Sequence, residues 1–61
     1  MSKWIIVEVH TNGKKVALPT EYDKYEDACT EQEIFEDVNP HKAYLIYTND
    51  EWMYEVENGR A

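Results

Sequence analysis

The sequence predicts an α+β domain with the element order ββαββ, in which one helix covers one face of a four-stranded, mainly antiparallel sheet. Three observations support this fold class: an Asn-Gly pair between two apolar runs, an acidic segment with helical periodicity, and two more apolar runs around a polar turn. Such a pair of layers is a common small architecture. We expect a single domain over residues 1–61, with strands over about 3–11, 14–19, 42–48 and 51–57 and a helix over about 24–37.

The first hairpin is predicted by Asn12-Gly13, which follows a run rich in β-branched residues. Asn-Gly favours a type I′ turn, because this turn needs a positive φ at both central residues. With this pair at the turn, Val9 pairs with Val16. One apolar face then contains Ile5, Val7, Val9, Val16 and Leu18. Pro19 has no N–H, so it either ends the second strand or places that strand at the edge of the sheet.

The helix is predicted by the capping-box spacing of Asp23 and Glu26, with Asp23 as N-cap. At about 100° per residue, one side of the helix is its packing side. That side carries Tyr25, Ala28, Cys29, Gln32 and Phe35. Pro40 disfavours helical geometry at Asn39, so the helix is expected to end near Val38.

The second hairpin follows, with Tyr47 opposite Trp52. We expect the helix to cover the sheet face formed by Ile5, Val7, Val9, Val16, Leu18, Leu45, Tyr54 and Val56. The other face then presents Trp4, Ile6, Tyr44, Ile46 and Met53. Large apolar side chains in water each forgo roughly 1.5–3 kcal/mol of burial, and contiguous patches of them mark association sites. This face is therefore a predicted homodimer interface, unless it is kept for a foreign partner, covered by the tails, or misassigned by a one-residue register error.

The length and composition favour stabilisation by a partner chain. A chain of 61 residues buries only about 60 % of its unfolded surface. The single cysteine excludes an internal disulfide, and Cys29, His10 and His41 are too few and too scattered for a zinc site. No cofactor or metal is therefore expected. No membrane span or signal-peptide pattern is present, which indicates a reduced, cytoplasmic setting.

The charge of the chain is concentrated in residues 21–37, which hold eight acids and Lys24 and so equal the net charge of −7 of the whole protein. The candidate binding residues on this helix are Glu26, Asp27, Glu31, Glu33, Glu36 and Asp37. Over residues 21–37 the eight acids give one charge per roughly 3 Å of helix axis, close to the phosphate spacing of about 3.4 Å in one DNA strand. The helix therefore either fits a cleft built for a nucleic-acid backbone or is an ordinary solvated surface.

No residue pattern indicates catalysis. Cys29 has acidic sequence neighbours, which disfavour a reactive thiolate, and the carboxylates lie on a convex helix without a calcium-loop pattern. The acidic balance also argues against direct binding to nucleic acid or to an anionic membrane. We therefore expect a protein that is not an enzyme.

In its short length, strong acidity and compact α+β pattern without a catalytic motif, the chain resembles the small acidic proteins that bacteriophages encode to inhibit host or defence enzymes. Some of those proteins mimic DNA, and others block a protein surface or dimerise. The resemblance implies an inhibitor in the host cytoplasm, and no motif assigns site residues by analogy. We expect a non-enzymatic protein that inhibits or modulates a larger, nucleic-acid-handling protein through its acidic helix. The alternative is a homodimeric structural or regulatory module that works through its aromatic sheet face.

Overall fold

The computed structural model describes residues 3–59, which form three strands and two helices. The elements are β1 (Trp4–Val9), β2 (Lys15–Tyr22), α1 (Tyr25–Val38), β3 (Ala43–Thr48) and α2 (Asn49–Glu57). The strands form one antiparallel sheet in the order β2-β1-β3, so β1 is central and the other two are edge strands. The α+β class is confirmed, but the predicted order ββαββ is wrong, because the last element is a helix.

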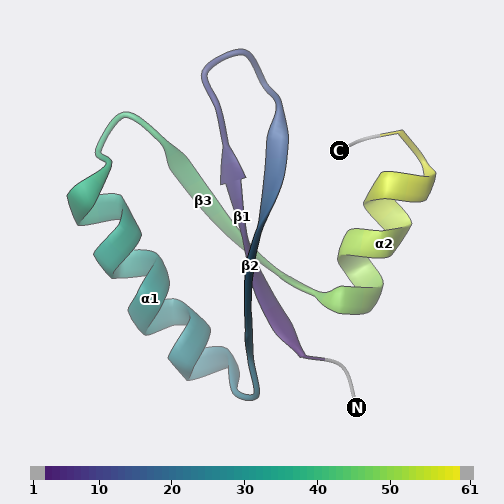
Figure 1. Ribbon diagram of the computed structural model, residues 1–61, viewed down its shortest axis with the longest axis horizontal. Helices are drawn as coiled ribbons and strands as arrows, with labels where there is room; N and C mark the ends of the chain where they lie inside the picture. Colours follow the sequence, from purple (N-terminus) through teal and green to yellow (C-terminus); the bar gives the residue numbers. More distant parts are fainter. Residues whose placement is uncertain (1–2, 60–61) are drawn as a thin grey trace.

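The molecule is a flat disc with the sheet in its middle. Figure 1 shows the three strands crossing over one another at the centre, with α1 on one side and α2 on the other. The view is down the shortest axis, and the extents are 29 × 29 × 14 Å. Since the strands are stacked along this short direction, the outer edges of β2 and β3 lie on the two broad surfaces of the disc.

The segment predicted as a fourth strand, 51–57, is part of α2, and Thr48 explains the difference. Its hydroxyl accepts a hydrogen bond from the Glu51 N–H at 3.1 Å, while its own N–H donates to Glu51 Oε1 at 2.9 Å. This reciprocal pair is a capping box, which satisfies two backbone donors at a helix start. Tyr47 and Trp52 do meet, with ring centroids 5.8 Å apart, but across a strand–helix contact.

The first hairpin forms, but with a longer loop than the predicted type I′ turn. The Gly13 N–H donates to the His10 carbonyl at 2.9 Å, and the His10 N–H donates to the Lys14 carbonyl at 2.9 Å. Gly13 has φ +86°, while no other kind of residue within 3–59 has a positive φ. This geometry is a three-residue loop that ends in a left-handed glycine. The register is shifted by one residue, so Val9 faces Lys15 and not Val16.

Pro19 lies inside β2, which continues to Tyr22. The β1–β2 pairing is interrupted there, because Val7 faces Ala17 whereas Ile5 faces Glu21. Three residues of β2 therefore lie opposite Ile6, which makes a bulge. A proline without an N–H is tolerated at such a bulge in an edge strand. Of the two alternatives for Pro19, the edge position is confirmed and the strand end is wrong.

Helix α1 covers the sheet face opposite to the predicted one. Trp4 packs edge-on against Tyr25 with ring centroids 4.9 Å apart, and Tyr44 stacks on Phe35 at 5.4 Å. Ile6 is 0 % exposed and Tyr44 is 3 % exposed. The prediction that this face stays open as a homodimer interface is therefore wrong, because α1 of the same chain packs on it. The physical reason is that the aromatic and largest apolar residues of the sheet gain most from burial under the helix.

Helix α1 itself forms close to the predicted bounds, and its packing side is as predicted around Ala28, which is 0 % exposed. The predicted N-cap is wrong. Lys24 occupies that position without a side-chain cap, and the Asp23 carboxylate pairs with Lys3 Nζ at 2.5 Å.

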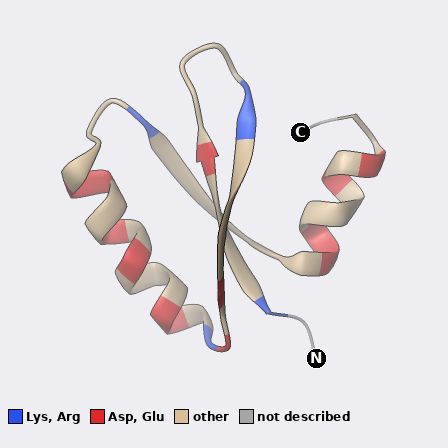
Figure 2. Ribbon diagram, viewed as in Figure 1, with Lys and Arg blue, Asp and Glu red and all other residues tan. Residues whose placement is uncertain are grey.

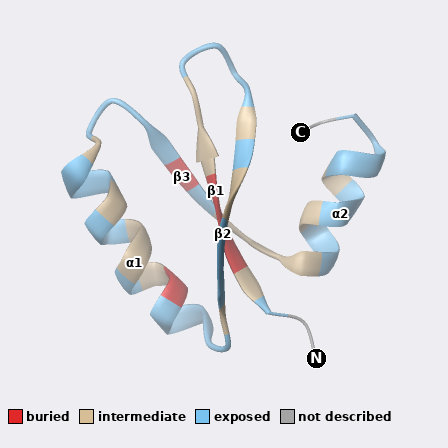
Figure 3. Cartoon of the chain, in the orientation of Figure 1, coloured by how far each residue is buried: buried red, intermediate tan, exposed pale blue. Residues whose placement is uncertain are grey.

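The core is centred on β1, and α2 adds little to it. Ile5, Ile6 and Val7 are 5 %, 0 % and 0 % exposed. Figure 3 shows the buried positions on the strands and on one turn of α1, and α2 has no buried residue. Among the described residues, neither helix has the length and apolar character needed to cross a membrane.

Candidate functional site

The two helices carry most of the acidic residues and no basic ones. Helix α1 contains six acids and α2 contains four, and neither contains Lys or Arg. The rest of the chain has three acids and six bases, a net charge of +3. Figure 2 shows the acids on the two flanking helices and the bases near the ends of the strands. The charge is therefore separated by element, with an acidic layer on each side of the sheet.

The six predicted binding residues on α1 have no basic partner among the described residues. The ion pairs within residues 3–59 join Lys3 to Asp23 and join Glu8 to both His10 and Lys42. None of these pairs involves α1. The candidate acids Glu26, Asp27, Glu33, Glu36 and Asp37 are exposed, and Glu31 is half-buried.

Glu31 lies on the side of α1 that faces β2. Burial raises the pKa of the Tyr22 hydroxyl, and the charge of Glu31 raises it further, while a hydrogen bond with Thr20 acts in the opposite direction. Glu31 is therefore turned away from the outer acidic surface, and its predicted partner role has less structural support than that of Glu33 or Asp37.

The structure brings together four of the five residues predicted as an interface, but not the fifth. Trp4, Ile6, Tyr44 and Ile46 share the face beneath α1, as their pairing across β1 and β3 shows. Met53 lies on α2 and is 55 % exposed. No single surface therefore contains this set.

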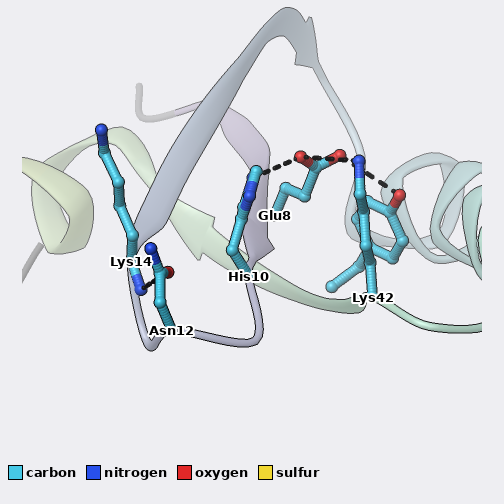
Figure 4. Close-up of polar contacts among 6 residues, drawn as sticks. Glu8, His10, Asn12, Lys14 and Lys42 are labelled. Carbon is cyan, nitrogen blue, oxygen red and sulfur yellow. Dashed lines mark hydrogen bonds and ion pairs between the residues drawn. The ribbon is translucent and has the colours of Figure 1, made fainter.

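A polar cluster centred on Glu8 lies at the end of the sheet near the first hairpin (Figure 4). Glu8 Oε1 lies 2.6 Å from His10 Nε2 and 3.4 Å from Lys42 Nζ, and the Tyr44 hydroxyl donates to Glu8 Oε2 at 3.3 Å. Burial raises the pKa of Glu8, but the Lys42 charge and hydrogen bonds from Lys42, His10 and Tyr44 outweigh it, so the pKa is below the ordinary value. The cluster ties β1 to β3 by ionic contacts.

Sequence reasoning missed the Glu8 cluster, although the alternation of β1 places Glu8 and His10 on one face. The signal was weak because Lys42 and Tyr44 reach Glu8 only after β3 pairs with β1 in its actual register. Burial raises the pKa of Tyr44, and the nearby Glu8 carboxylate raises it further. This hydroxyl therefore stays protonated at neutral pH and serves as a hydrogen-bond donor rather than a base.

A pocket of about 370 Å³ lies between β3 and α2, and it also was not predicted. Its lining residues are Tyr47, Asp50, Glu51, Tyr54 and Glu55. The lining combines two aromatic rings with three acidic residues, and these groups are already engaged: Glu51 caps α2, and Asp50, Tyr54 and Glu55 each have an interaction within the protein. The predicted strand over 51–57 gave no indication of this pocket, because only a helix brings these residues together.

Residues 3–59 contain no group of three or more His, Cys, Asp or Glu side chains placed to hold a metal ion. Comparison with protein-family models, with curated proteins and with solved structures finds no match. The functional argument therefore rests on the charge distribution and on the surfaces of this chain alone.

Proposed function

We propose that the protein is a non-enzymatic binding protein that inhibits or modulates a larger, nucleic-acid-handling protein by docking the acidic surface of α1 on a basic surface. The observation that carries this proposal is the set of six α1 acids without a basic partner in the described chain. The resemblance to small acidic phage inhibitors supports the same proposal and makes a host or defence enzyme the expected target.

The spacing of the α1 acids supports mimicry of a nucleic-acid backbone. The 14 residues of α1 span about 21 Å at a rise of about 1.5 Å per residue. The five exposed carboxylates over this length give one charge per roughly 4 Å, which is comparable to the phosphate spacing of about 3.4 Å in one DNA strand. A cleft that binds that backbone through Lys and Arg would meet a comparable charge density on α1.

The arrangement of these acids also works against the stability of the isolated helix. Glu33 and Asp37 are like charges four residues apart, which destabilises a helix. Glu36 and Asp37 lie in the last turn, where the helix dipole disfavours negative charge and where α1 has no basic residue. Retaining acids at positions that cost stability is expected if they serve binding.

The proposal is tested by capture from a lysate of the source cells. Immobilised protein should enrich nucleic-acid-binding proteins at about 0.05 M salt, and both duplex DNA and about 1 M salt should displace them, because the attraction acts over a Debye length of about 8 Å near physiological salt. A partner that stays bound at the higher salt and in excess DNA would contradict the electrostatic mechanism.

The alternative is a homodimeric module that works through its aromatic sheet face. In the single chain, α1 packs on this face. Ile6 and Tyr44 are buried within the single chain. A homodimer remains a prediction only through another surface.

A further inference from the structure

The outer edge of β3 presents backbone groups in a defined pattern. The Asn49 N–H donates to the Lys3 carbonyl at 3.0 Å, which continues the β1–β3 ladder by one residue. In an antiparallel pair, hydrogen-bonded and non-hydrogen-bonded positions alternate. Residues 43, 45 and 47 therefore bond inward to β1. The N–H and C=O groups of Tyr44, Ile46 and Thr48 point outward, to the open edge.

Side chains from the two helices occupy both ends of this edge and leave its middle open. Gln32 Nε2 of α1 donates to the Tyr44 carbonyl at 2.6 Å, and Glu51 Oε1 of α2 accepts from the Thr48 N–H at 2.9 Å. Within residues 3–59, no hydrogen bond reaches the outward N–H and C=O of Ile46. Ile46 is therefore the point at which an added strand can pair with β3.

The opposite edge of the sheet is protected in ways that β3 is not. Strand β2 begins with Lys15 and contains Pro19 and a bulge, all of which block strand addition. Strand β3 has the sequence Ala-Tyr-Leu-Ile-Tyr-Thr, without a charge, proline or bulge. The two edges therefore differ, and only β3 offers regular backbone for pairing.

Acidic side chains lie on both sides of the β3 edge. On the α1 side, Gln32 reaches the edge itself, and Glu36 follows it one turn later on the same side of the helix. On the α2 side, Glu51 reaches the edge at Thr48 and also lines the pocket beside Tyr47. Glu51 thus places a carboxylate at the edge along which an added strand would lie.

We propose that β3 accepts an extended, basic segment of the partner protein as a fourth strand, with a Lys or Arg side chain on the α2 face beside Tyr47 and Glu51. The strand runs antiparallel, because one residue of an antiparallel partner can exchange both hydrogen bonds with Ile46. The side chain of that residue lies on the α1 face, and the neighbouring residue, opposite Tyr47, points to the α2 face. This inference rests on the proposed function, since it names the part of the partner that binds.

Charge favours a basic segment over a second copy of this chain as the added strand. Two copies paired through β3 about a two-fold axis perpendicular to the sheet would place α1 beside α1 and α2 beside α2. Each of these helices contains acids and no base, so like charges would face each other across both layers. A Lys- or Arg-bearing segment meets complementary charge on the same flanks.

The test uses a synthetic peptide of alternating Lys and Val, with a central Val to pair with Ile46 and a Lys next to Tyr47. Titrated into ¹⁵N-labelled protein, it should slow hydrogen exchange of the Ile46 amide. A matched peptide with an N-methyl group on the central Val cannot donate to the Ile46 carbonyl, and it should bind at least about tenfold more weakly. A peptide with Glu in place of Lys should not bind.

Two protein variants separate the Glu51 carboxylate at the edge from overall charge. Glu51→Gln keeps an oxygen that can accept from Thr48 but removes a charge from the β3 edge, so it should weaken binding of the Lys-Val peptide several-fold. Glu57→Gln removes the same charge at the exposed end of α2, outside the pocket lining, and should bind as the unchanged protein does.

Several results would overturn strand addition. Strand addition is wrong if the N-methylated peptide binds as tightly as the Lys-Val peptide. It is also wrong if the peptide shifts the NMR signals of α1 without slowing hydrogen exchange of the Ile46 amide. Either result would leave the proposed docking of α1 intact. If hydrogen exchange of the Ile46 amide slows with rising protein concentration in the absence of peptide, the edge pairs with a second copy of the chain instead. If the peptide fails and the salt-sensitive capture also fails, the proposed function falls with this inference.

Discussion

Thr48 and Glu51 cap the start of α2 reciprocally, each accepting a hydrogen bond from the backbone N–H of the other at 3.1 and 2.9 Å. Because α2 has no buried residue, the cap stabilises a helix that has little core packing. We predict that Thr48→Ala lowers the free energy of unfolding by about 1 kcal/mol. Helical chemical shifts over 49–57 should weaken. Thr11→Ala, in the exposed hairpin loop, is the control and should change neither quantity.

The burial of Ile6 beneath α1 makes a second prediction. Ile6→Val should lower the free energy of unfolding by about 0.5–1.5 kcal/mol, and Ile6→Ala by about 2–5 kcal/mol, which is enough to unfold a small domain. Met53→Ala, at a side chain that is 55 % exposed, should change it by less than about 0.5 kcal/mol. Urea denaturation measures these differences. Equal effects at the two sites would contradict the position of α1 on this sheet face.

Gly13 makes the hairpin loop possible through its φ of +86°. A Cβ at this position would meet nothing within 4 Å, so the cost of Gly13→Ala is one of backbone conformation and not of collision. We predict a loss of about 1–2 kcal/mol for Gly13→Ala and a smaller loss for Gly13→Asn, because Asn tolerates the left-handed region better. A Gly13→Ala protein as stable as the original in thermal unfolding would argue against this loop.

The lowered pKa of Glu8 predicts a specific dependence of stability on pH. A carboxyl with a folded-state pKa below its ordinary value of 4.5 stabilises the folded protein above that pH. This contribution disappears as the pH falls through the lowered folded-state pKa. The stability advantage of the original protein over Glu8→Gln should therefore be full at neutral pH and shrink in acid. An advantage that stays constant down to about pH 2 would contradict the ion pairs around Glu8.

Most of the first forty residues could be predicted from sequence, because their signals are local. The β-branched run with Asn-Gly predicted the hairpin, and the acidic segment predicted α1 to within one residue at each end. The one-residue register error came from treating Gly13 as half of a two-residue turn. That error reverses the faces of β2, since strand side chains alternate.

The end of the chain could not be assigned from alternation alone. Trp52, Tyr54 and Val56 alternate as in a strand, yet the capping-box spacing of Thr48 and Glu51 starts a helix there. The same spacing at Asp23 and Glu26 does not form a cap, because Lys24 is the N-cap of α1 and Asp23 pairs with Lys3. The open edge of β3 and the pocket beside it depend on how the strands pair and where the helices pack. These are tertiary contacts, so sequence reasoning could not locate either feature.

The measurement that tests the central claim most directly is the affinity of α1 variants for the captured partner. Glu33→Gln with Asp37→Asn removes two charges from the exposed side of α1. It should weaken binding roughly threefold to tenfold near physiological salt and reduce the dependence of binding on salt concentration. Glu57→Gln on α2 should bind as tightly as the unchanged protein. If all three proteins bind the partner equally at every salt concentration, the acidic surface of α1 is not the docking surface.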